Sequence, residues 1–135
     1  MIFILDTNIF LRVLIKEDKQ TFTDCVNFLE LVKNKKIEAV VPGVVLSEIA
    51  WVLKSFYSFS KSKIVKALKS IIKLNGLEIV DDYDYDQALD FYSKKNVKYI
   101  DCLIASLAKG KNYTVISYDQ DFDKLKVKRR EPSSF

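Results

Sequence analysis

The chain has 135 residues, of which 49% are hydrophobic, so it has the size of one domain with a single core; we expect one domain over residues 1–130 and a short tail over residues 131–135. It contains no histidine, which excludes a Ser-His-Asp triad, a histidine general base and the usual zinc ligand sets, and its net charge is +4. No apolar run approaches the ~20 residues that a membrane span needs, and Met1–Leu5 lacks the basic flank and the length of a signal peptide, so we expect a cytoplasmic protein with no membrane partner.

The first third of the chain alternates between apolar strands and amphipathic helices. The run Ile2–Leu5 is continuously apolar and is bounded by polar residues, which predicts a parallel strand covered on both faces. A short helix is expected through residues 9–15. A second helix begins at Lys19 or Thr21 and ends at Lys33, because apolar residues recur there at helical spacing. Residues 38–41 predict a second strand.

Pro42-Gly43 and Asn75-Gly76 interrupt the pattern in the rest of the chain, since these residues favour turns and helix ends. The further elements that we predict are helices over residues 44–57, 60–74, 84–95 and 99–109, strands over 77–80 and 113–116, and a short edge strand over 125–128. The segment 131–135 is expected to be frayed.

Strands separated by helices predict a parallel sheet, because parallel neighbours need a crossover connection. The expected fold class is therefore α/β, a three-layer α/β/α arrangement with a central parallel sheet of four to five strands. Ligands of such folds bind beyond the carboxyl ends of the strands. This rule favours Asp6, which follows the first strand, and Asp119, which closely follows the strand at 113–116.

Two further carboxylates lie on predicted helix faces that are otherwise apolar. Glu48 has valines and Trp51 around it on the helical wheel, and a buried carboxylate needs a cation, a hydrogen-bond donor or a metal. Asp101 shares its face with Ile104 and Ala105, so its side chain should point inward. The structural alternatives are a salt bridge from Glu48 to a lysine and a helix-dipole role for Asp101.

The residues around Asp6 and Asp119 have structural alternatives as well. Asp6 precedes a helix and could be its N-cap, while Asn8 could orient a water molecule without adding negative charge. Asp121 could support the site, although we favour it as the cap of a helical turn over residues 122–125. The denser acidic run over residues 81–86 precedes a helix and is expected to be exposed or to cap that helix.

Four converging carboxylates would make an oxygen-rich pocket of the kind that binds Mg²⁺ or Mn²⁺. Such an ion would neutralise the carboxylates and lower the pKa of bound water. Lysines are grouped over residues 33–36, 61–73, 94–98 and 124–130, where they would attract a phosphate backbone; solvation of helix faces is the alternative. The two cysteines lack metal-ligand spacing and are expected to be buried free thiols.

Four motifs follow one another along the chain: Asp6-Thr7-Asn8 after an apolar strand, Ser47-Glu48 on a helix, Asp101-Cys102-Leu103-Ile104-Ala105 on a later helix, and Ser117-Tyr118-Asp119-Gln120-Asp121-Phe122 near the end. This order resembles the PIN-domain family of nucleases, and the resemblance covers essentially the whole chain. The chain is similar in length to the single-domain members that serve as VapC-type toxins of prokaryotic toxin–antitoxin pairs.

The resemblance implies a divalent-metal-dependent endoribonuclease that hydrolyses RNA phosphodiester bonds. The positions that match the family's acidic catalytic and metal-binding residues are Asp6, Glu48, Asp101 and Asp119. Asn8 and Ser117 match polar neighbours of that site. The resemblance also implies a homodimer and a protein antitoxin that inserts a segment toward the acidic site.

Three other functions are open at this point. An RNA-processing PIN nuclease outside a toxin pair would carry the same carboxylates, and an inactive PIN-like module would bind RNA or protein without turnover. A phosphoacceptor receiver domain would need an aspartate after the third strand and a lysine beyond a later strand. Asp81 meets the first requirement, but residues 117–119 offer no lysine and Glu48 would be unexplained.

Overall fold

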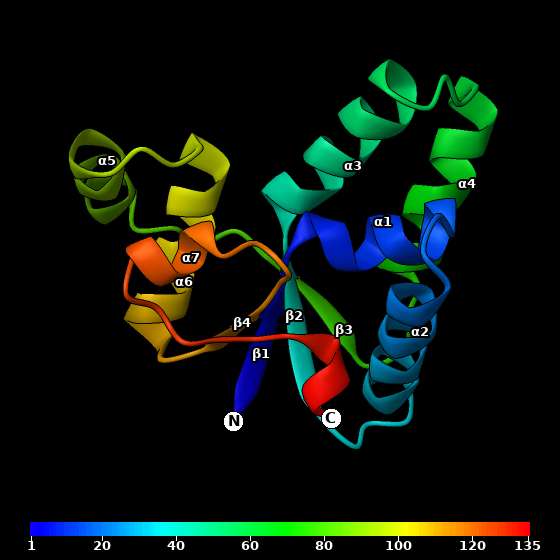
Figure 1. Ribbon diagram of the computed structural model, residues 1–135, viewed down its shortest axis with the longest axis horizontal. Coiled ribbons are helices and arrows are strands. Elements are labelled where there is room, and N and C mark those ends of the chain that lie inside the picture. The colour runs from blue at the N-terminus through cyan, green and yellow to red at the C-terminus, as the bar shows by residue number, and fades with distance from the viewer.

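The computed structural model describes residues 1–135 and has a parallel sheet between two layers of helices (Figure 1). The strands are β1 (Ile2–Leu5), β2 (Glu38–Pro42), β3 (Leu77–Val80), β4 (Thr114–Ile116) and β5 (Arg129–Arg130), in the order β3-β2-β1-β4-β5. All neighbouring strands are parallel. The predicted three-layer α/β/α fold is confirmed.

Seven α-helices connect the strands, with α1 to α4 on one side of the sheet and α5 to α7 on the other (Figure 1). They are α1 (Thr7–Ile15), α2 (Lys19–Lys33), α3 (Gly43–Ser55), α4 (Lys61–Ile72), α5 (Tyr85–Lys94), α6 (Tyr99–Lys111) and α7 (Asp121–Lys124). Several begin at polar caps, because the side chains of Asp18, Ser60 and Asp84 each accept a backbone N–H of the first turn. None of these helices is both long and apolar enough to cross a bilayer.

The centre of the sheet is β1, which explains its unbroken apolar sequence. Ile4 and Leu5 are completely buried, because helices cover both faces of this strand and β2 and β4 pair with its edges. The helical layer that contains α6 is also well buried, since every residue from Asp101 to Ala108 is nearly inaccessible to solvent. Leu5 lies opposite Ile116, so the residues that follow these two strands emerge side by side. That edge of the sheet is where the candidate site lies.

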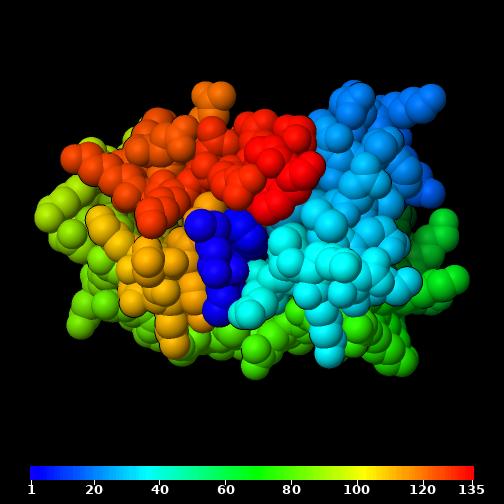
Figure 2. Space-filling view, turned by 90° about the horizontal axis from the view of Figure 1, so that it is seen from below, coloured from blue at the N-terminus to red at the C-terminus, as the bar shows by residue number.

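The C-terminal segment differs from its prediction in two ways. The edge strand is β5 at Arg129–Arg130 rather than at residues 125–128, because Lys126 adopts a left-handed conformation with φ 57° and the extended chain begins only after it. The tail is not frayed: residues Pro132–Ser134 form a 3₁₀ turn, and the Phe135 ring packs edge-on against Phe3 at 5.0 Å. Figure 2 shows this last segment, in red, lying directly against the start of β1, in blue.

Candidate metal centre

Asp6 combines a capping role with a position at the carboxyl end of β1. Its Oδ1 accepts the backbone N–H of Thr7 at 2.8 Å, as expected for the N-cap of α1. Its Oδ2 accepts the hydroxyl of Ser117 at 2.6 Å and the Nδ2 of Asn8 at 3.2 Å. The Asn8 Nδ2 also donates to Ser117 Oγ at 3.1 Å. These bonds hold the Asp6 side chain in one orientation. The carboxylate that caps α1 can therefore also belong to the candidate site.

Asp119 lies in the turn between β4 and α7, and Asp121 is the first residue of α7. The Asp119 backbone N–H donates to Ser117 Oγ at 2.9 Å, and Asp119 Oδ1 accepts the backbone N–H of Asp121 at 2.9 Å. The capping role that we favoured for Asp121 is therefore wrong, because Asp119 supplies the acceptor at the start of α7. The carboxylate of Asp121 pairs instead with Lys124 at 3.0 Å.

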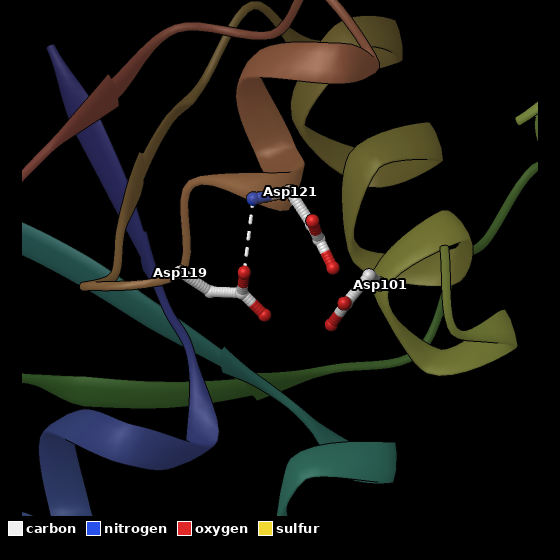
Figure 3. A group of neighbouring side chains, drawn as sticks. All are labelled: Asp101, Asp119 and Asp121. Atoms are coloured by element: carbon white, nitrogen blue, oxygen red, sulfur yellow. Dashed lines mark hydrogen bonds between the residues drawn. The ribbon is translucent and has the colours of Figure 1, made fainter. Parts of the chain in front are cut away.

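Asp101 is the most enclosed of the carboxylates that converge here. It lies in the first turn of α6, is 1% exposed, and its Oδ2 has no hydrogen-bond partner although it is buried. Figure 3 shows Asp101 directed from α6 toward Asp119 and Asp121. One carboxylate oxygen of each of these three residues lies within 4.8 Å of the others. Three acceptors at this spacing, one without a donor, fit the oxygen ligands of a hard divalent cation.

Glu48 projects from α3 toward the same end of the sheet. Its side chain is 22% exposed, and its Oε2 lies 3.8 Å from the Nζ of Lys98, a loose ion pair. Lys98 immediately precedes α6, and sequence reasoning did not assign it to the site. Its position three residues before Asp101 is the available signal, but only the tertiary fold brings the start of α6 to Glu48.

A cavity of about 140 Å³ opens beside Asp6, Glu48 and Asp119, and neither Asp101 nor Asp121 lines it. Its lining residues are Asp6, Thr7, Asn8, Leu11, Glu48, Val52, Lys98 and Asp119. A larger cavity of about 510 Å³ lies over the sheet at Ile2, Glu38 and Val40 and contains none of the predicted site residues. Chemistry rather than size identifies the first cavity as the candidate site.

The electrostatics of the site favour a bound cation. The pKa of Asp6 is raised to about 6, chiefly by burial and also by the charges of Glu48 and Asp119, while the hydrogen bonds from Ser117 and Thr7 oppose the increase. Burial, together with the charge of Asp6, raises the pKa of Asp101 to about 7, which Lys98 partly offsets. These carboxylates are close enough to destabilise one another when ionised, and a divalent ion would relieve that repulsion.

A comparison with known families decides the identity of the fold. The profile described as "PIN domain" matches residues 3–128. The chain belongs to the PIN domain family. The match begins in β1 and extends beyond α7, so it includes the whole acidic cluster of this PIN domain.

Individual relatives agree with that assignment. A VapC ribonuclease from Aquifex aeolicus (strain VF5) is 26% identical over 130 residues, which is 96% of each chain. VapBC2 from Rickettsia felis, solved bound to a DNA fragment from their promoter, matches this PIN domain with a TM-score of 0.73 at 23% identity over 97% of this chain and 98% of that chain. FitAcB from Neisseria gonorrhoeae matches with a TM-score of 0.69 at 18% identity over 100% of both chains. The two solved structures show that the fold is shared.

Proposed function

We propose that this PIN domain is a divalent-metal-dependent endoribonuclease and the toxin of a toxin–antitoxin pair. The observation that carries the proposal is the Asp101 carboxylate, which has a buried and unpartnered Oδ2 and lies beside Asp119 and Asp121 at the carboxyl end of the sheet. The similarity to a VapC ribonuclease over nearly the full chain supports the reaction. The structural similarity to VapBC2 and FitAcB supports a protein antitoxin as partner.

The residues that we propose to hold Mg²⁺ or Mn²⁺ and to act in catalysis are Asp6, Glu48, Asp101 and Asp119, with Asp121 beside them. When bound, the ion would neutralise these carboxylates, acidify the attacking water and stabilise charge on the phosphate. Ser117 and Asn8 keep Asp6 in position through the hydrogen bonds described above. Lys98 places a positive charge beside Glu48 at the mouth of the site.

The positive charge near this acidic centre is suited to the phosphate backbone of RNA. Five lysines and a single carboxylate line a cavity of about 310 Å³ between α5, α6 and the end of α7: Lys94, Lys95, Lys109, Lys124, Lys126 and Asp90. We call this the lysine pocket. Lys124 also pairs with Asp121, so the lysine pocket adjoins the carboxylates. A phosphate backbone could run from one to the other, and a single-stranded or looped RNA enters such a confined site more readily than a duplex.

A homodimer and a cytoplasmic location complete the proposal. On α5 the side chains of Tyr85, Leu89 and Tyr92 recur at helical spacing and are each more than half exposed, at 58%, 53% and 53%. An apolar stripe of this kind is suited to a second copy of the chain. RNA substrates and an antitoxin would both be met in the cytoplasm.

The test is to incubate antitoxin-free protein with a pool of structured and single-stranded RNA in Mg²⁺, Mn²⁺ or EDTA, beside Asp101→Asn and the exposed control Asp86→Asn. We expect metal-dependent cutting by the wild-type protein and the control but not by Asp101→Asn. RNA binding without cutting in any metal would identify a binding module. Cutting by Asp101→Asn would refute the site assignment. Cutting by a protein that captures no antitoxin encoded beside it would favour an RNA-processing nuclease.

A further inference from the structure

A second cavity adjoins the candidate metal centre and is not explained by metal binding. It has a volume of about 230 Å³ and is lined by Asn8, Leu11, Arg12, Ile15, Glu17 and Tyr57. We call it the Arg12 pocket. Asn8 and Leu11 also line the cavity over the carboxylates, so the two cavities are neighbours along α1. A polymer bound at the metal centre could therefore place an adjoining group in the Arg12 pocket.

Arg12 is the unusual residue of this pocket. Its side chain is half-buried, and its guanidinium lies over the ring of Tyr118, with 5.4 Å from Cζ to the ring centroid. The Tyr118 hydroxyl lies 3.5 Å from Cys25 Sγ, which limits the movement of the ring. Arg12 makes no hydrogen bond and no ion pair within the chain. The donors of a positioned guanidinium are thus free for a ligand.

The other side chains of the pocket indicate what kind of ligand this is. Glu17 follows Lys16, whose left-handed conformation (φ 59°) ends α1, and its exposed carboxylate makes no ion pair. This carboxylate interacts with the Tyr57 side chain but has no cationic partner. It disfavours a phosphate as the occupant, because two anions repel each other. Tyr57 adds a 38% exposed ring on which a base could stack, and Leu11 and Ile15 add apolar surface. A base with both donors and acceptors matches this set better than an anion does.

We propose that the Arg12 pocket binds an unpaired guanine of the RNA, in the nucleotide next to the bond that is cut; this rests on the proposed nuclease function. Guanine offers two N–H donors on its Watson–Crick edge, which match the Glu17 carboxylate. It offers the O6 and N7 acceptors on its other edge, which match the Arg12 guanidinium. A paired guanine would have its Watson–Crick edge occupied, so the base must come from a single strand or a loop.

The test uses three oligouridines that carry one central G, A or C, each labelled with fluorescein at the 5′ end. With Mg²⁺ or Mn²⁺, wild-type protein should cut beside G with a kcat/KM about tenfold or more above that for A or C. Glu17→Gln and Arg12→Gln should each abolish most of this preference. Glu30→Gln, an exposed carboxylate of α2, should retain it.

Binding gives a second measurement that does not depend on cutting. Fluorescence polarisation of the same oligonucleotides with the Asp101→Asn protein should show the tightest binding for G, and adding Glu17→Gln should equalise the three affinities. Equal affinities for G, A and C, or cutting with no base preference, would overturn the guanine subsite and leave the nuclease proposal intact. A preference for G in binding, with no cutting by wild-type protein, would reject the nuclease and retain the subsite.

Discussion

The hydroxyl of Ser117 donates a hydrogen bond of 2.6 Å to Oδ2 of Asp6, joining residues that are 111 positions apart in the chain. The bond ties the end of β4 to the end of β1. The same oxygen of Ser117 accepts the backbone N–H of Asp119 at 2.9 Å, so one serine positions a carboxylate on each strand end. Ser117 therefore links the two strand ends and positions both Asp6 and Asp119 of the candidate site.

Replacing Ser117 by alanine tests this dependence. Its hydrogen bond lowers the pKa of Asp6, which burial raises to about 6, so Ser117→Ala should raise that pKa further. The acidic limb of the pH–rate profile should move to higher pH, and activity near neutral pH should fall by about 10- to 100-fold. Ser106→Ala is the matched control, because this buried serine bonds only the carbonyl of Leu103. An unchanged profile in Ser117→Ala would show that the bond does not position the site.

Metal binding should raise the thermal stability of the folded protein. At an ion concentration of about 100 times the Kd, the free energy of unfolding should increase by about 2.7 kcal/mol, which corresponds to roughly 10 °C in Tm. Differential scanning fluorimetry with Mg²⁺, Mn²⁺ and EDTA measures this shift. The same ions should have a much smaller effect on Asp119→Asn. A Tm indifferent to both ions would contradict the metal centre.

Asp101→Asn should stabilise the metal-free protein above neutral pH. Burial raises the pKa of Asp101 from 3.8 to about 7, so the folded protein loses stability as pH rises from about 4 to about 7. The asparagine variant lacks that loss and should be more stable at pH 8 by about 1–3 kcal/mol. Below pH 4 the carboxyl is protonated in both folded and unfolded chains, and this advantage should disappear.

Urea unfolding in EDTA across this pH range provides the measurement. Asp86→Asn serves as the control, because Asp86 is exposed and should show little change over the same interval. A variant that is less stable than wild-type protein at pH 8 would mean that Asp101 has a stabilising partner.

The lysine pocket should control the salt dependence of RNA binding. Replacing Lys94, Lys95 and Lys126 by glutamine should weaken binding and reduce the slope of log K against log salt by about 2, at roughly 0.7 for each phosphate contact on a single strand. A control with Lys61 and Lys69 of α4 and its C-cap Lys73 replaced by glutamine changes the net charge equally. Equal loss of slope in both variants would show that RNA responds only to total charge.

The contact of the C-terminus with β1 should contribute measurably to stability. Phe135 packs edge-on against both Phe3 and Phe28, at ring distances of 5.0 and 4.9 Å. Phe135→Ala should lower the free energy of unfolding by about 1–2 kcal/mol. Phe56→Ala, at a phenylalanine that is 70% exposed, should cost less. Equal costs would indicate that the tail does not hold its position in solution.

The order of helices and strands could be predicted because local pattern determines it. The continuous apolar run of β1 reflects burial on both faces, and the inward face of Asp101 followed from helical spacing. The start of β5 could not be predicted, because it depends on the left-handed conformation of Lys126. Apolar pattern carries no information on that conformation.

The details of the site depended on tertiary contacts and were harder to predict. Two aspartates lie two residues apart at the start of α7, and local capping rules cannot tell which of them accepts the backbone N–H or that both lie close to Asp101. The helical wheel placed Glu48 among apolar residues, yet Trp51 on that wheel is 58% exposed. The ion pair of Glu48 with Lys98, the residue before α6, depends on the tertiary fold, which the helical wheel does not describe.

The central position of β1 has a consequence for how the protein is made. The proposed site combines Asp6 after β1 with Asp119 after β4 and Asp121 at the start of α7, and β4 pairs directly with β1. No nascent chain that ends before residue 121 contains all of these carboxylates. Pairing β1 with β4 also requires residues that are distant in sequence to meet, which slows folding. A ribosome translating this message therefore carries an incomplete site until it has passed residue 121.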